Sequence, residues 1–122
     1  MSQPFKLVLL SVAPDLPSQL SQLPNRDFNI ISFFRKEDSL SALNERSIDV
    51  AILDLELFSL EDVKQLCRQF PKTAFICTHR LADDEMWMKA LTAGAEDCCR
   101  QDAVTIADSV HRALARAHAA AA

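Results

Sequence analysis

Apolar residues along this chain gather in five short runs, and a segment of helical pattern follows each of them. The runs occupy 6–11, 28–34, 49–54, 73–78 and 97–99. The central run, Asp49-Val50-Ala51-Ile52-Leu53-Asp54, ends in a carboxylate. Continuous apolar runs of this length predict buried strands of a parallel sheet. Because ligands of such sheets bind where the strands end, Asp54 is predicted to lie at the rim of a crevice.

The segments between these runs have the periodicity of helices. Each places apolar residues three or four positions apart, which predicts one buried face on a helix. The expected helices cover 16–23, a short segment capped by Asp38, 59–70, 83–93, and a last segment that starts near Asp102. The last helix is expected to bury Val104, Ala107, Val110 and Leu114.

Two local signals mark helix ends. Ser59 and Asp62 are three residues apart, as in a capping box, where each side chain accepts the backbone N–H of the other residue. Gly94 is the one glycine in the sequence and follows 83–93, where a left-handed residue ends a helix. Because strands and helices alternate without a linker or repeat, we predict one doubly wound α/β domain over residues 1–122.

Composition excludes several classes of protein. The formal net charge is -4, and acidic and basic residues are interspersed. Since no block of Lys and Arg occurs, nucleic-acid binding is disfavoured. No segment approaches the roughly 20 apolar residues of a membrane span, and the N-terminus lacks the pattern of an export signal. We therefore expect a cytoplasmic protein that does not bind membranes.

The residue types needed for several chemistries are absent from the sequence. Cys67, Cys77, Cys98 and Cys99 form no CxxC pair and have no histidine at zinc-ligand spacing, so they are predicted to be small buried hydrophobic residues. Phosphate-binding loops of nucleotide enzymes need several glycines, and this chain has only Gly94. His79 has no orienting acid nearby in the sequence, which indicates a loop residue and not a general base. The chain is not expected to be an enzyme.

Four motifs resemble those of one signalling family. They are Leu7-Val8-Leu9-Leu10 followed by Pro14, the run ending at Asp54, Phe75-Ile76-Cys77-Thr78, and Ala93-Gly94-Ala95-Glu96-Asp97. Their order and spacing resemble the receiver domains of bacterial response regulators over nearly the whole chain. The resemblance implies a flavodoxin-like (βα)5 three-layer sandwich whose parallel strands are ordered 2-1-3-4-5. It also places Asp54 on the position that accepts a phosphoryl group, and Thr78 on the hydroxyl of the phosphate pocket.

Other positions depart from the receiver pattern. The two acids that hold Mg²⁺ in the family fall on Ser11 and Val12, the phosphate-binding lysine falls on Gln101, and the switch aromatic falls on Cys98. A hydroxyl and an apolar side chain cannot supply the anionic oxygens that a hard cation needs. Phosphoryl transfer without the charge of a metal ion loses orders of magnitude in rate. We therefore expect a pseudo-receiver with no Mg²⁺ cofactor and a degraded phosphorylation site. A purely structural role for Asp54, as a carboxylate that caps the end of a strand, is an equal alternative to residual phosphorylation.

The resemblance also implies a surface for protein contact. In receivers the fourth helix, fifth strand and fifth helix carry dimer and output contacts. In this sequence that surface draws on Trp87, Met88, Cys98 and Arg112, with Asp84 and Arg116 beside them. We expect signal transduction through a protein partner or a homodimer bound to this surface.

Two alternatives stay open at this point. The first is a phosphorelay receiver that a histidine kinase still phosphorylates on Asp54, with Asp15 replacing a lost acid as a metal ligand. The second is the receiver-like N-terminal localisation domain of a Tad-type pilus-assembly ATPase. The sequence does not separate a stand-alone protein from a domain of a longer one.

Overall fold

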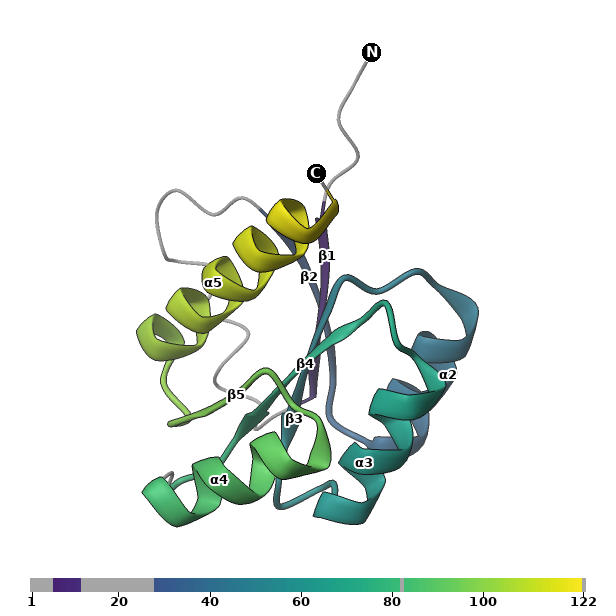
Figure 1. The fold of residues 1–122 in the computed structure, drawn as a ribbon. Helices are drawn as coiled ribbons and strands as arrows, with labels where there is room; N and C mark the ends of the chain where they lie inside the picture. The colour runs from purple at the N-terminus through teal and green to yellow at the C-terminus, as the bar shows by residue number, and fades with distance from the viewer. Residues whose placement is uncertain (1–5, 12–27, 82, 122) are drawn as a thin grey trace.

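A five-stranded parallel sheet forms the centre of the molecule (Figure 1). The computed structural model describes residues 6–11, 28–81 and 83–121. The strand order is β2-β1-β3-β4-β5, as the receiver resemblance implied. The strands are β1 (Lys6–Ser11), β2 (Phe28–Phe33), β3 (Val50–Asp54), β4 (Ala74–Thr78) and β5 (Asp97–Cys99).

Helices cover both faces of this sheet. They are α2 (Lys36–Glu45), α3 (Leu60–Gln69), α4 (Asp84–Ala93) and α5 (Ala103–Ala121). Buried residues of α2, α3 and α4 belong to one core cluster, whereas α5 packs into a second cluster on the other face. The helix predicted over 16–23 lies outside the described residues, so the full (βα)5 count stays a prediction.

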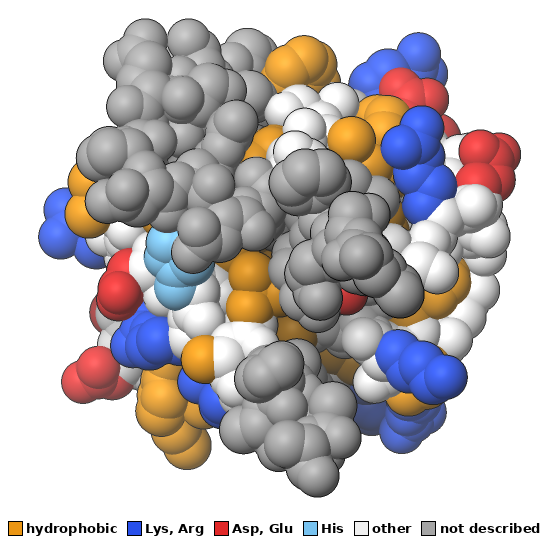
Figure 2. All heavy atoms as spheres, turned by 90° about the horizontal axis from the view of Figure 1, so that it is seen from above, with side chains coloured by type: hydrophobic (Ala, Val, Ile, Leu, Met, Phe, Trp, Pro, Cys, Tyr) orange, Lys and Arg blue, Asp and Glu red, His pale blue; other side chains and the backbone are white. Residues whose placement is uncertain are grey.

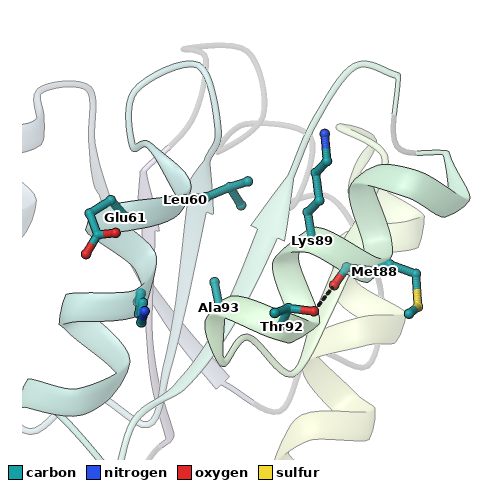
Figure 3. Close-up of a pocket in the computed structure, with 7 residues that line it drawn as sticks. Leu60, Glu61, Met88, Lys89, Thr92 and Ala93 are labelled. Carbon is teal, nitrogen blue, oxygen red and sulfur yellow. Dashed lines mark hydrogen bonds between the residues drawn. The ribbon is translucent and has the colours of Figure 1, made fainter.

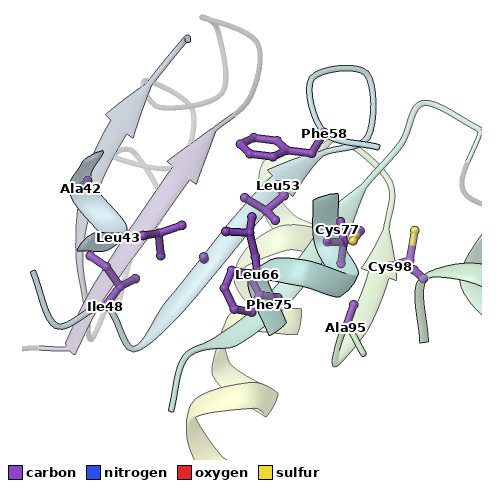
Figure 4. Close-up of a cluster of buried hydrophobic side chains, with 13 residues drawn as sticks. Ala42, Leu43, Ile48, Leu53, Phe58, Leu66, Phe75, Cys77, Ala95 and Cys98 are labelled. Carbon is purple, nitrogen blue, oxygen red and sulfur yellow. The ribbon is translucent and has the colours of Figure 1, made fainter. Parts of the chain in front are cut away.

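The central strand divides its side chains between the two cores. Val50 and Ile52 face α5, and Ala51 and Leu53 face the α2–α4 side, all at 1% exposure or less. Figure 4 shows Leu53 close to Leu66 of α3 within the cluster that contains the buried residues of α2, α3 and α4. Because successive side chains of a strand point to opposite faces, a strand buried on both sides must be largely apolar, as β3 is from Val50 to Leu53.

Both predicted helix-end signals are confirmed. The Ser59 side chain accepts the N–H of Asp62, and the Asp62 carboxylate accepts the N–H of Ser59, each at 3.0 Å. Gly94 takes a left-handed conformation with φ of 113° immediately after α4. The capping box therefore fixes where α3 begins after β3, and Gly94 ends α4 so that the chain can turn into β5.

Two details of the helices were wrongly predicted. Asp38 is not the N-cap of α2, which begins at Lys36 without a side-chain cap. Tertiary contact anchors this earlier start, because the Lys36 ammonium lies 2.6 Å from the Asp62 carboxylate and 5.8 Å from the centre of the Phe58 ring. Val104 is 68% exposed, since the buried face of α5 runs through the neighbouring positions Ala103, Ile106, Val110 and Ala113.

Gly94 supports a prediction on stability. A Cβ atom at this position would lie 3.1 Å from Cys67 Cβ and 3.2 Å from Cys67 Sγ. Because the positive φ is itself unfavourable for a side chain, Gly94→Ala is expected to lower the free energy of unfolding by about 1–3 kcal/mol in urea melts. The same change in a Cys67→Ala background should lose less, because only the backbone strain remains there. An equal or smaller loss in the original background would show that the cysteine contact is unimportant.

Candidate functional site

Two of the predicted pocket residues lie side by side where β3 and β4 end. Asp54 pairs with Thr78 in the register of these strands, and both residues are buried, at 4% and 0% exposure. Asp54 Oδ1 accepts the backbone N–H of Glu56 at 2.9 Å, and its carbonyl oxygen accepts the N–H groups of Leu57 and Phe58. The carboxylate therefore caps the turn between β3 and α3, as its structural interpretation predicted.

The surroundings of Asp54 disfavour its charged form. Burial raises the pKa of the Asp54 carboxyl above its ordinary value, and the nearby Glu56 carboxylate also raises it. The N–H of Glu56, the side chain of Gln101 and the charge of His79 lower this pKa, but they do not reverse the shift. Asp54 is thus an acid that the fold holds in a poorly solvated place.

Gln101 joins this pocket from the loop after β5, as the resemblance implied. The Thr78 hydroxyl and the Gln101 amide nitrogen are buried without a well-formed hydrogen bond to the described residues, although the Gln101 side chain lies close enough to Asp54 to lower the pKa of that carboxyl. Buried polar groups without partners are rare in folded proteins. His79 was predicted to be a loop residue. It is half-buried, and its Nδ1 accepts the backbone N–H of Leu81 at 3.0 Å.

Among the described residues, no group of acids fits the Mg²⁺ ion that the receiver resemblance implies, and Asp15, the acid considered as a stand-in ligand, lies outside them. The acid nearest in sequence to Asp54 is Glu56, whose carboxylate lies 2.7 Å from the guanidinium of Arg80. Within residues 6–11, 28–81 and 83–121, no three Asp, Glu, His or Cys side chains converge as a metal-ligand set. Ser11 ends β1 beside Leu53, and Val12 lies outside the described residues, so their predicted roles stay predictions.

A second carboxylate, Asp97, organises the predicted contact surface. Its Oδ1 accepts the Trp87 indole N–H at 3.1 Å, and its Oδ2 accepts the Ser109 hydroxyl at 2.7 Å and the Arg112 guanidinium at 3.3 Å. Asp97 therefore connects α4, β5 and α5. Sequence reasoning named this residue only as part of a turn motif, and the signal it overlooked was an acid at the start of a buried strand.

The four predicted contact residues differ in exposure. Trp87 is 41% exposed and Met88 is 57% exposed, so both large side chains reach solvent from α4. The side chain of Arg112 is 57% exposed on α5. Cys98 is 7% exposed and belongs to the core behind α4, so it presents almost no surface. We define the Trp87 face as Glu96, Asp97 and the exposed side chains of Trp87, Met88, Asp108, Arg112 and Arg116.

A shallow groove adjoins this face between α3 and α4. It has a volume of about 380 Å³ and is lined mainly by carbon atoms. Figure 3 shows Leu60 at the start of α3 and Ala93 at the end of α4 on facing sides of the groove. Met88 belongs both to the groove and to the Trp87 face.

The remaining predicted exclusions concern cysteines and surfaces. All four cysteines are free, and burial raises the pKa of Cys98 to about 11 and that of Cys99 to about 12, which keeps these thiols unreactive. On the face seen in Figure 2, acidic and basic side chains are mixed around the rim. None of the described helices combines the length and the apolar character needed to span a bilayer.

Comparison with known proteins identifies the fold. No family model matches this chain, and no curated protein matches it. A response regulator from Thermotoga maritima matches with a TM-score of 0.78 at 16% identity, over 93% of this chain and 99% of that chain. The signal receiver domain of a putative LuxO repressor protein from Vibrio parahaemolyticus matches with a TM-score of 0.79 at 21% identity, over 95% of this chain and 94% of that one.

A third match carries a modified aspartate. It is a response regulator protein from Burkholderia pseudomallei with a phosphorylated aspartic acid, a calcium ion and citrate. Its TM-score is 0.66 at 16% identity, over 80% of this chain and 60% of that chain. The chain has the receiver fold. At these identities the likeness establishes the architecture alone, and the chemistry must be argued from the residues above.

The shifted pKa of Asp54 predicts a pH dependence of stability. A carboxyl whose pKa is raised in the folded state stabilises the fold when protonated, and this contribution is lost as the pH rises through the folded-state pKa. Asp54→Asn should therefore be more stable than wild type at pH 7, by no more than about 1 kcal/mol. In urea melts the advantage should shrink as the pH falls through the folded-state pKa towards about 4, and it should be constant below that pH, where the carboxyl is neutral in both the folded and the unfolded chain. A variant less stable than wild type at pH 7 would indicate a stabilising partner of the carboxylate.

Proposed function

We propose that this chain is a pseudo-receiver that acts in signal transduction through protein contact on the Trp87 face, without phosphorylation of Asp54. The observation that carries the proposal is the Asp97 network, which positions an exposed tryptophan on α4 against an exposed arginine on α5. We place this activity in the cytoplasm and assign it no enzymatic step.

The chemistry around Asp54 supports the loss of phosphorylation. Added phosphate would bring more negative charge to a carboxylate that already resists ionisation. Gln101 offers a neutral amide where receivers have a lysine, and the Glu56 carboxylate is engaged with Arg80. Since phosphoryl transfer depends on nearby positive charge, these residues stabilise the transition state less than a metal ion and a lysine would.

The charges of the Trp87 face favour a second copy of this chain as its partner. Glu96, Asp97 and Asp108 supply negative charge, and Arg112 and Arg116 supply positive charge. These charges pair with one another within the chain, so the same patch of two subunits can meet across a two-fold axis without strong like-charge repulsion. The exposed Trp87 provides the large aromatic area that commonly dominates binding energy.

The first test concerns phosphate transfer. After incubation with acetyl phosphate and Mg²⁺, intact mass spectrometry should show no gain of a phosphoryl group on the wild-type protein. A triple variant, Ser11→Asp, Val12→Asp and Gln101→Lys, restores the two acids and the cation and should gain one phosphoryl group. That gain should be absent when Asp54→Ala is added. Phosphorylation of the wild-type protein, lost in Asp54→Ala, would instead establish a working receiver.

The second test concerns contact. Trp87→Ala should abolish self-association in analytical ultracentrifugation, since truncating a central aromatic typically costs about 2 kcal/mol or more of binding. Because the indole is partly exposed, the free energy of unfolding should fall by less than about 1 kcal/mol.

Matched controls separate this effect from a general loss of apolar surface. Phe34 is 52% exposed and follows β2, at the opposite edge of the sheet, so Phe34→Ala should associate like wild type. Asp54→Ala should also associate normally. Association that requires Asp54 and tolerates Trp87→Ala would return function to the strand-end pocket.

One observation favours the phosphorelay alternative. Asp54 and Thr78 retain the adjacent, buried arrangement expected of a phosphoacceptor and its hydroxyl partner. The phosphorylation test above distinguishes this alternative from the pseudo-receiver. The Tad-type localisation domain stays a prediction from the sequence.

A further inference from the structure

An open pocket lies at the amino-terminal end of the sheet, opposite the end that carries the strand-end pocket. It has a volume of about 480 Å³. One wall is the segment between α2 and β3, which includes Arg46 and Asp49, and the other is the segment between α3 and β4, which includes Phe70, Pro71 and Lys72. Because β3 and β4 start at this pocket and end at the strand-end pocket, the two sites share no residue.

The two cations of this pocket are available for a ligand. Arg46 and Lys72 are exposed, and neither side chain forms an ion pair or a hydrogen bond with any residue that the structure describes. Arg80, in contrast, is paired with Glu56 at 2.7 Å. Asp49 is the one acid of the lining; it is half-buried and already interacts within the chain. The lining therefore carries a net positive charge even when Asp49 is counted as negative.

The surroundings extend this charge and add an apolar wall. Arg68 is exposed next to Gln69, which lines the pocket, and Arg68 also has no ion pair in the described parts of the chain. Phe70 is half-buried and Pro71 is exposed, so carbon atoms of both can contact a ligand. We define the Arg46 pocket as Arg46, Phe70, Pro71 and Lys72, with Arg68 at its edge.

We propose that the Arg46 pocket binds an acidic peptide segment of a partner protein. Carboxylates of the segment pair with Arg46, Lys72 and Arg68, because guanidinium groups match the geometry of a carboxylate. An apolar side chain between these carboxylates packs on Phe70 and Pro71, which removes its surface from water. This surface is separate from the Trp87 face, so the proposal goes beyond self-association.

The charges favour a peptide over a nucleic acid. A nucleic-acid strand carries a phosphate at every nucleotide and is bound by long rows of cations. The Arg46 pocket offers three cations beside an apolar wall, and the whole chain has a net charge of -4. A short segment with a few carboxylates around one apolar side chain fits this arrangement better.

Binding is measured by fluorescence anisotropy of a labelled, capped peptide, Asp-Glu-Phe-Glu-Asp, titrated with the full chain. We expect saturable binding that weakens as NaCl is added, because salt screens exposed charges. A peptide with alanine in place of phenylalanine should bind more weakly, since it leaves the apolar wall uncovered. A peptide with lysine in place of all four acids should not bind.

Variants test whether the cations of the pocket carry this binding. Arg46→Ala and Lys72→Ala should each weaken affinity about two- to fivefold, as expected for exposed ion pairs. Glu45→Gln removes an exposed acid next to Arg46 and should bind at least as tightly as wild type. Arg100→Ala is the matched control, because Arg100 is also exposed and unpaired among the described residues but lies at the opposite end of the sheet. This variant and Trp87→Ala should bind the peptide like wild type.

Four results would overturn the proposal. The first is the absence of saturable binding of the acidic peptide. The second is equal affinity in wild type, Arg46→Ala and Lys72→Ala, with native circular dichroism spectra for all three. The third is a single-stranded DNA oligonucleotide that binds more tightly than the peptide and loses affinity in the same two variants. The fourth is loss of self-association in Arg46→Ala, which would assign the pocket to a second copy of this chain. The first three leave the contact proposal untouched, because the Trp87 face contains none of these cations.

Discussion

Burial of β3 on both faces is the constraint on which the rest of the structure depends. Residues from Val50 to Leu53 are at most 1% exposed, and they alternate between the two cores. Such a strand requires helices on both sides of the sheet. It also places Asp54 in the interior, at the carboxyl end of the central strand, where the residue is 4% exposed. Burial is thus the largest cause of the raised Asp54 pKa, ahead of any single neighbour.

Two carboxylates at strand ends, Asp97 at the start of β5 and Asp54 at the end of β3, have opposite surroundings. Asp97 accepts hydrogen bonds from an indole, a hydroxyl and a guanidinium, which connect three elements around one acid. Asp54 has the N–H of Glu56 on one oxygen and lies among groups that do not neutralise it. A network such as that of Asp97 is rigid because every polar group in it has a hydrogen-bond partner. A buried carboxylate with few partners, such as Asp54, costs free energy instead. The contrast explains why we place function at Asp97 and not at Asp54.

The sequence predicted the strands well because each is a short apolar run, and the strand order followed from the resemblance to receivers. The sequence also predicted that Asp54, Thr78 and Gln101 lie together, because the carboxyl ends of parallel strands meet on the same side of the sheet. Other features depend on contacts between distant residues. The start of α2 depends on Lys36 reaching Asp62, and the exposure of Val104 depends on a shift of one residue in the buried face of α5. An acid at the start of a buried strand was a signal for Asp97, but its partners were not predictable because they are 10 to 15 residues away in sequence.

Backbone hydrogen exchange at low and high protein concentration tests the location of the functional surface most directly. The account predicts that exchange slows with concentration in α4 and on the exposed side of α5, around Trp87 and Arg112, and that Asp54→Ala shows the same pattern. Slowed exchange confined to the loops after β3 and β4, with no change in α4, would contradict it.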